Sequence, residues 1–132
     1  MKYEKLALLT IAVLHLIVQV IHGYSHVAAD VQNTPLQLVF ILLFITIAPL
    51  VAVYIVWKGN IRKGAGLFTL SMVAAFLFGY FLHFVIDSPD LHSNVIGEHK
   101  SVFFHSALNL ALFEFVGFVF GTYVFLAGRN EP

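Results

Sequence analysis

The sequence predicts an all-α integral membrane protein, a four-helix bundle with up-down-up-down connectivity. Of the 132 residues, 60% are hydrophobic and only 11% are charged, whereas about 25% of a typical soluble domain is charged. The apolar residues fall into four long blocks, each near the 20 residues or so that a helix needs to cross a bilayer. These blocks nearly fill the chain, so we expect a single domain over residues 1–132.

The expected spans cover residues 6–26, 35–57, 64–86 and 100–127. The second span has a clear start, because Thr34 is a suitable N-cap residue and Pro35 suits the first helical position. Pro49 lies inside the same span and should kink it, since proline cannot donate a backbone hydrogen bond.

The distribution of charge predicts the orientation of the bundle. Lys58, Arg62 and Lys63 lie at the turn between the second and third spans, whereas the other two connections carry mainly carboxylates and histidines. Because basic segments stay on the cytoplasmic side, we expect both termini in the cytoplasm. The histidine-rich loops are then expected on the non-cytoplasmic side.

The first span has a second interpretation, as a secretory signal with a cleavage site near residues 27–29. Cleavage would remove His15 and two further histidines of this span. The span is longer than most signal cores, and it contains His15 and Gln19, which are poor residues for such a core. We therefore favour a retained helix.

A stripe of polar residues follows one face of the first span. Its members, His15, Gln19, His22 and His26, are spaced 4, 3 and 4 positions apart, which places them on one side of a helix. Polar side chains are costly in lipid. We expect this stripe to face the bundle interior or a partner subunit.

The third and fourth spans carry similar polar stripes. The third has Tyr80, His83 and Asp87, and the fourth has Glu98, Ser101, His105 and Asn109. At about 1.5 Å of rise per residue, His22, His83 and His105 reach a similar depth. Asp87 and Glu98 then lie with His26 on the outward side of this layer, and Gln19, Tyr80 and Asn109 lie on the inward side.

This layering predicts a metal site with His22, His26, His83 and His105 as candidate ligands. The chain has no cysteine, so a metal would be held by imidazole and carboxylate groups, which suits a copper, zinc or iron ion. Haem b with axial imidazoles from two helices is a second possibility. Asp87 and Glu98 would orient the rings or complete the coordination. A hydrogen-bonded packing network and a proton or solute path are the alternatives.

A buried acid in the fourth span, Glu114, shares a helix face with Gly117 and Gly121. The G-x-x-x-G spacing permits close helix contact, which indicates an interface with another subunit. A second interpretation pairs Glu114 with His15 as a proton-handling couple. A third is a protonated glutamate that hydrogen bonds to a nearby hydroxyl.

Together these features predict a metal- or haem-binding subunit of a membrane redox complex. The alternatives are a non-catalytic assembly subunit of a larger membrane complex and a small metal or proton transporter. The expected partners are the lipid bilayer and either other membrane subunits or further copies of the chain.

Net charge is zero, which gives no electrostatic basis for nucleic-acid binding. The sequence does not decide whether the protein is itself an enzyme.

Overall fold

The structure, a computed structural model, describes residues 2–128, and over this range it contains helices and no strand. The helical elements are α1 (Lys2–Ala28), α2 (Pro35–Phe40), η1 (Ile41–Ile47), α3 (Ala48–Trp57), α4 (Ile61–Phe84) and α5 (Lys100–Ala127). The segments α2, η1 and α3 are continuous and form the second long helix. The resulting four helices are long and apolar enough to cross a membrane, and their bounds lie close to the predicted spans.

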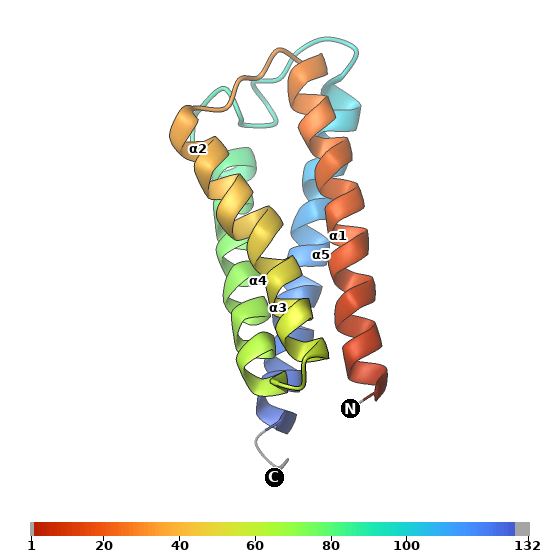
Figure 1. The fold of residues 1–132 in the computed structure, drawn as a ribbon. Coiled ribbons are helices and arrows are strands. Elements are labelled where there is room, and N and C mark those ends of the chain that lie inside the picture. Colours follow the sequence, from red (N-terminus) through yellow and green to blue (C-terminus); the bar gives the residue numbers. More distant parts are fainter. Residues whose placement is uncertain (1, 129–132) are drawn as a thin grey trace.

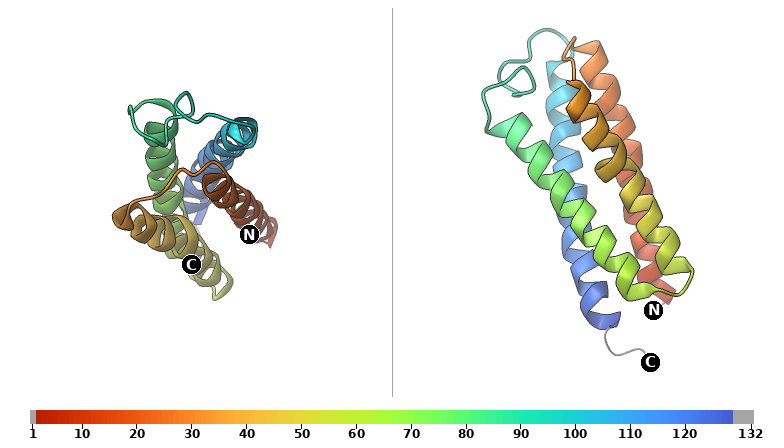
Figure 2. Two further views of the ribbon diagram at one scale, coloured as in Figure 1. Left: turned by 90° about the horizontal axis from the view of Figure 1, so that it is seen from above. Right: turned by 60° about the vertical axis from the view of Figure 1, so that its left-hand side comes forward.

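The long helices run alternately up and down, so α1 begins and α5 ends at the same end of the bundle (Figure 1). Residues 29–34 and 85–99 connect the helices at the opposite end, which we call the loop end (Figure 2). Helix α5 packs against α1 and α4, and α4 packs against α3. Near the loop end, α2 leans away from α1 (Figure 1), so the bundle is more open there.

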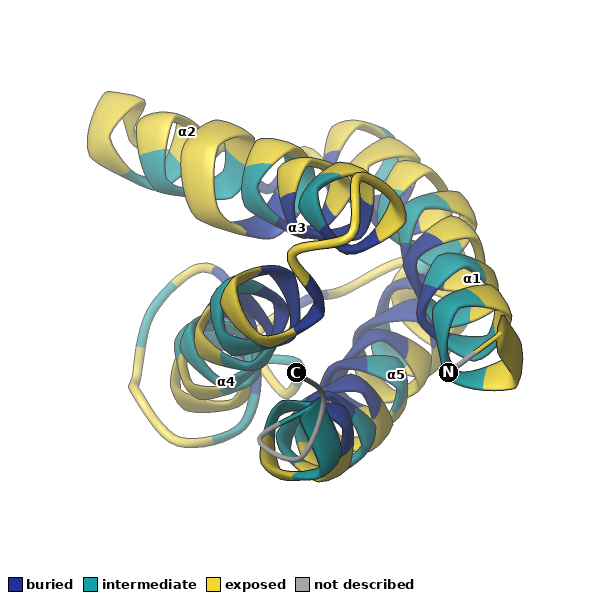
Figure 3. Cartoon of the chain, turned by 60° about the horizontal axis from the view of Figure 1, so that its bottom comes forward, coloured by how far each residue is buried: buried dark blue, intermediate teal, exposed yellow. Residues whose placement is uncertain are grey.

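Buried residues line the inward faces of the helices, and exposed residues cover the outside (Figure 3). Away from the loop end, the core is apolar and includes Leu8, Phe68, Met72 and Val124, which are completely buried. The outside is apolar as well; Leu70, for example, is 67% exposed. Helices that are apolar on all sides are typical of membrane spans.

The second long helix begins as predicted. The Thr34 hydroxyl accepts a hydrogen bond from the Gln37 backbone N–H, and the Gln37 side chain accepts one from the Thr34 backbone, which forms a capping box. The distortion predicted at Pro49 takes the form of the π-helical segment η1, which ends two residues before the proline. A π-helical turn widens the backbone hydrogen-bonding pattern and is a known cause of bends.

Three glycines allow the helices to approach closely inside the bundle. A Cβ atom on Gly64 would lie 2.6 Å from the Ala52 backbone oxygen, which shows how tightly α4 packs on α3. Gly117 and Gly121 of α5 face α4, where Cβ atoms would lie 2.9 Å from Met72 and 2.7 Å from Thr69. The close contact expected of this G-x-x-x-G pair is therefore made within the chain.

Candidate metal centre

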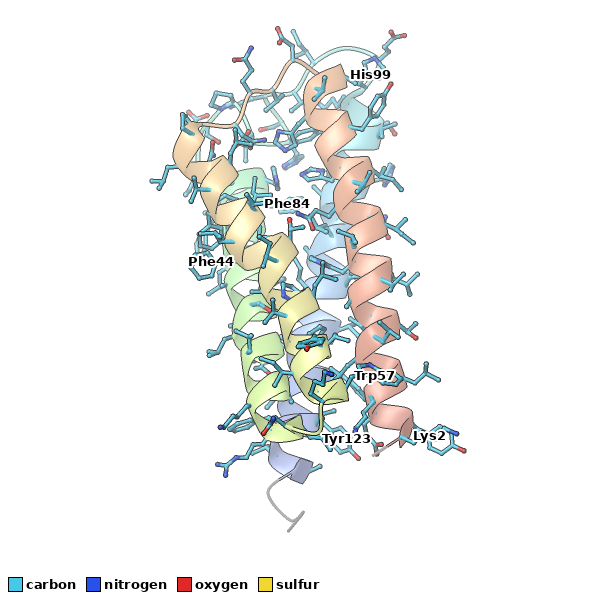
Figure 4. All side chains as sticks on the ribbon, in the orientation of Figure 1. Lys2, Phe44, Trp57, Phe84, His99 and Tyr123 are labelled. Atoms are coloured by element: carbon cyan, nitrogen blue, oxygen red, sulfur yellow. The ribbon has the colours of Figure 1, made fainter. Side chains whose placement is uncertain are left out.

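Three buried histidines meet between α1 and α4 near the loop end. His22 and His26 lie one turn apart on α1, and His83 lies in the last turn of α4. The Nε2 atom of His22 is 3.1 Å from Nε2 of His83 and 3.2 Å from Nε2 of His26. Each residue offers one ring nitrogen, and all three nitrogens lie within 4.8 Å of one another. Side chains that carry nitrogen gather in this part of the bundle (Figure 4).

The outer ring nitrogens of His26 and His83 are held by backbone carbonyls. Nδ1 of His26 is 3.1 Å from the Val31 carbonyl oxygen, and Nδ1 of His83 is 3.0 Å from that of Asp90. A carbonyl oxygen only accepts hydrogen bonds, so both Nδ1 atoms must carry the proton and donate it. In the neutral rings, Nε2 is then an unprotonated lone pair that points into the cluster.

His22 is held in the same way by a hydroxyl. Its Nδ1 lies 2.9 Å from Oγ of Ser106, and that hydroxyl donates its own proton to the Phe103 carbonyl, 3.1 Å away. The neighbouring Ser25 hydroxyl donates to the His22 carbonyl at 2.6 Å. When the Ser106 hydroxyl donates to Phe103, Nδ1 of His22 is the donor to Ser106, and its Nε2 is also left with a lone pair.

Three lone pairs that face one another over such distances repel unless something positive lies between them. The other tautomer of His22 would place one proton on Nε2, but that proton can be shared well with only one neighbour. The second neighbour would still lack a donor, and buried polar atoms are rarely left without one. A bound cation satisfies all three nitrogens at once.

The spacing of the nitrogens suits a metal ion. A tetrahedral ion with metal–nitrogen bonds of 2.0–2.1 Å separates its ligand atoms by roughly 3.3 Å. The Nε2 atom of His22 lies 3.1 and 3.2 Å from the Nε2 atoms of His83 and His26. The rings of His26 and His83 are farther apart, with their centroids separated by 5.5 Å. The centroids of the other two ring pairs are separated by 4.7 Å. A small rotation of either ring would bring three imidazoles around one ion.

The surroundings of the cluster are asymmetric. Phe103 of α5 is completely buried, and its ring lies 4.9–5.4 Å from the centroids of all three imidazoles, so it covers one side. The other side faces a cavity of about 640 Å³, which all three histidines line. A metal held here by three ligands would therefore present its open coordination position to the cavity.

The fourth predicted ligand, His105, is not brought into this cluster. Its side chain is exposed and contacts the ring of Phe104. Asn109, one turn further along the same face, is exposed too, and its amide donates to the His105 carbonyl. The α5 stripe that contains both residues faces outward, whereas the stripe that contains Ser106 and Glu114 faces inward.

The predicted supporting carboxylates also lie away from the rings. Asp87 is exposed and accepts a hydrogen bond from Asn94, and Glu98 is exposed with its carboxylate 3.7 Å from His99. Tyr80 is 43% exposed and stacks on Phe76.

The remaining predicted polar residues are inside the bundle, below the histidine cluster. Gln19 lines the cavity, and its amide donates to the Thr46 hydroxyl at 2.7 Å. His15 and Glu114 are both buried, with Nε2 and Oε1 3.4 Å apart. Of the interpretations considered for Glu114, the structure shows the pairing with His15 within the chain.

Residues that sequence reasoning missed hold the imidazoles in place. Asp90 is the most important, because its backbone carbonyl fixes His83 and its buried carboxylate lies 3.9 Å from Nδ1 of His26. No helical spacing pointed to Asp90, since it lies in the 85–99 loop, which folds back over the end of α4. Ser106 was detectable, because it shares a face with the small residues Gly117 and Gly121.

The chain matches no protein-family model, no curated protein and no solved structure. The fold and the cluster nevertheless define a class. This is an all-helical protein with four helices long and apolar enough to cross a membrane, and its buried histidine group could bind a metal ion.

Proposed function

We propose that this protein is a multi-pass membrane protein that binds one zinc or copper ion through His22, His26 and His83. One observation carries the proposal: the Nε2 atoms of three rings converge, while each Nδ1 lies within hydrogen-bond distance of a carbonyl or hydroxyl oxygen. Hydrogen bonds from Nδ1 to fixed acceptors set the tautomer and orientation of metal-binding histidines in known sites. Zinc and copper are preferred over iron because imidazole suits both metals, whereas non-haem iron is typically held by two histidines and a carboxylate.

A single ion is favoured over haem b by the arrangement of the rings. Two axial imidazoles stand on opposite faces of a porphyrin. Here the Nε2 atoms of His22 and His83 are 3.1 Å apart, which leaves no space for a porphyrin between them.

A three-histidine centre with an open fourth position can polarise a bound molecule or activate water. The cavity gives such a molecule a place beside the metal. A role in a membrane redox complex, as predicted from the sequence, requires a metal with two accessible oxidation states. Copper meets that requirement and zinc does not, so the identity of the metal decides between these roles.

The proposal is tested by the metal content of protein purified in detergent, after chelation and reloading with Zn²⁺ or Cu²⁺. We expect about one ion per chain in the wild type and a large loss in His83→Ala, because removal of one of three ligands opens the site. His105→Ala is the matched control and should retain the metal. Equal metal content in the two variants, or none in the wild type, would refute the proposal.

A further inference from the structure

The cavity beside the histidine cluster opens sideways, between α1 and the α2–η1 segment. Val20 and Val27 of α1 and Leu38 of α2 line it, and each is more than half exposed. Helix α2 leans away from α1 at this level (Figure 1). In helices that cross a membrane, such exposed apolar residues face lipid tails. The cavity therefore has an apolar opening toward the lipid tails in addition to a polar end, which Asp30, Gln32 and Asn33 of the 29–34 loop line.

The wall of the cavity carries two polar atoms that lack partners. Asp90 is 3% exposed, and although its Oδ2 accepts a hydrogen bond from Gln37, its Oδ1 has no hydrogen-bond partner among the described residues. Oε1 of Gln19 is likewise buried and has no hydrogen-bond partner among the described residues. Unpaired buried acceptors cost stability. Two of them in one cavity indicate a ligand that donates hydrogen bonds.

We infer that the cavity binds a lipid-soluble alcohol or phenol, whose hydroxyl head lies beside the histidine cluster and whose apolar body extends toward the lateral opening. The hydroxyl proton can be donated to one of these acceptors, Asp90 Oδ1 or Gln19 Oε1, and the hydroxyl oxygen would face the open metal position. Ile45, Phe78 and Leu82 supply apolar wall for the body. The cavity, about 640 Å³, lies within the range of small-molecule sites, which is roughly 300–1,000 Å³.

The chemistry of the cavity argues against other occupants. A small polar solute could enter from the loops, where Asp30, Gln32 and Asn33 line the cavity, but it would leave the apolar wall uncovered. A plain alkane could enter, but it would leave Asp90 Oδ1 and Gln19 Oε1 without donors. A hydroxyl-bearing amphiphile satisfies both parts of the cavity. This inference rests on the proposed function only where the hydroxyl oxygen binds the metal.

Photolabelling tests this assignment directly. The probe is dodecan-1-ol that carries a diazirine on its chain, added to the wild-type protein in phosphatidylcholine nanodiscs, with crosslinked peptides mapped by mass spectrometry. We expect labelling to concentrate on cavity-lining peptides of α1, η1 and α4. Unlabelled dodecan-1-ol should compete at least about tenfold better than dodecane, because a site with unpaired polar groups discriminates against a ligand that lacks the hydroxyl.

A cavity-filling variant provides a second test. A Cβ atom on Gly79 would make only ordinary contacts, 3.8 Å from Glu114 and 3.9 Å from His83, and Gly79 lines the cavity. Gly79→Leu should therefore fill the cavity and reduce its labelling severalfold. Leu77→Phe, at an exposed position of the same helix, is the matched control and should label like the wild type.

Metal content is measured in the same samples, so that the two proposals can fail separately. Cavity labelling that alcohol displaces better than alkane, in protein that binds no metal, would refute the metal site and support this inference. Uniform labelling of the outward faces, or equal competition by dodecane, would overturn this inference even if one metal ion per chain is present.

Discussion

His22 and His83, 61 positions apart in the sequence, bring their Nε2 atoms to 3.1 Å from each other. The other nitrogen of each ring is also held, in His22 by the Ser106 hydroxyl and in His83 by the Asp90 carbonyl. The close approach of two lone pairs is therefore built by the surrounding structure. Together with His26, the pair forms a group of nitrogens that could hold a metal ion.

The Ser106 hydroxyl should tune the affinity for the metal. It accepts the Nδ1 hydrogen bond of His22, and loss of such a supporting partner typically weakens metal binding about 10–100-fold. Ser106→Ala should lower the affinity by this order in a competition titration with a coloured chelator. Ser101→Ala, at an exposed position of the same helix, should bind like the wild type, and equal affinities in both variants would contradict the role given to Ser106.

The buried pair of His15 and Glu114 should be energetically coupled. The two side chains contact each other at 3.4 Å and are almost completely buried, so removal of one leaves the other without its partner. His15→Ala and Glu114→Ala should each lower the free energy of unfolding in detergent by roughly 1–3 kcal/mol. The double variant should lose less than the sum, as expected of residues in contact; additive losses would show that the pair does not interact.

The approach of α4 to α3 should depend on Gly64. A Cβ atom there would lie 2.5 Å from the Val56 side chain and 2.6 Å from the Ala52 carbonyl oxygen, and the backbone oxygen cannot move aside easily. Gly64→Ala should lower the melting temperature markedly. Gly23→Ala is the control, because its Cβ meets nothing within 4 Å and alanine is the better helix former by about 1 kcal/mol. Comparable losses in both variants would contradict the tight α3–α4 contact.

The orientation predicted from charge can be tested with single cysteines, since the chain has none. Ser93→Cys places a thiol at an exposed position of the 85–99 loop, and Asn60→Cys places one in the turn between α3 and α4. In intact cells, a membrane-impermeant maleimide should label Ser93→Cys and not Asn60→Cys, because basic segments stay in the cytoplasm. The reverse pattern would invert the proposed topology.

The sequence predicted the helices well because lipid imposes a strong and simple constraint. A span must be long, apolar and helical, and hydropathy records all three properties. The two α1 histidines of the cluster also follow from spacing alone, since His22 and His26 are four residues apart and face the same way. The sequence could also predict that His83 belongs to the cluster, because its depth in the third span is close to that of His22 and His26 in the first span.

The rest of the site could not be predicted because it depends on helix rotation and on a loop. His105 and Ser106 are adjacent, but one residue turns the helix by about 100°, so the choice between their stripes decides which residue faces inward. The buried small residues Gly117 and Gly121 lie on the Ser106 side. Asp90 replaces the expected Asp87 and Glu98 because the 85–99 loop folds over the end of α4, which no periodic pattern records.

The three-histidine centre can be probed by X-ray absorption spectroscopy at the metal edge, on protein loaded with one Zn²⁺ or Cu²⁺ per chain. The convergence of His22, His26 and His83 predicts three imidazole nitrogens at about 2.0–2.1 Å from the metal, with the outer-shell scattering that is typical of histidine rings. His83→Ala should lose one of these nitrogens or the metal itself. A spectrum with only oxygen ligands, or one that His83→Ala leaves unchanged, would contradict the three-histidine centre.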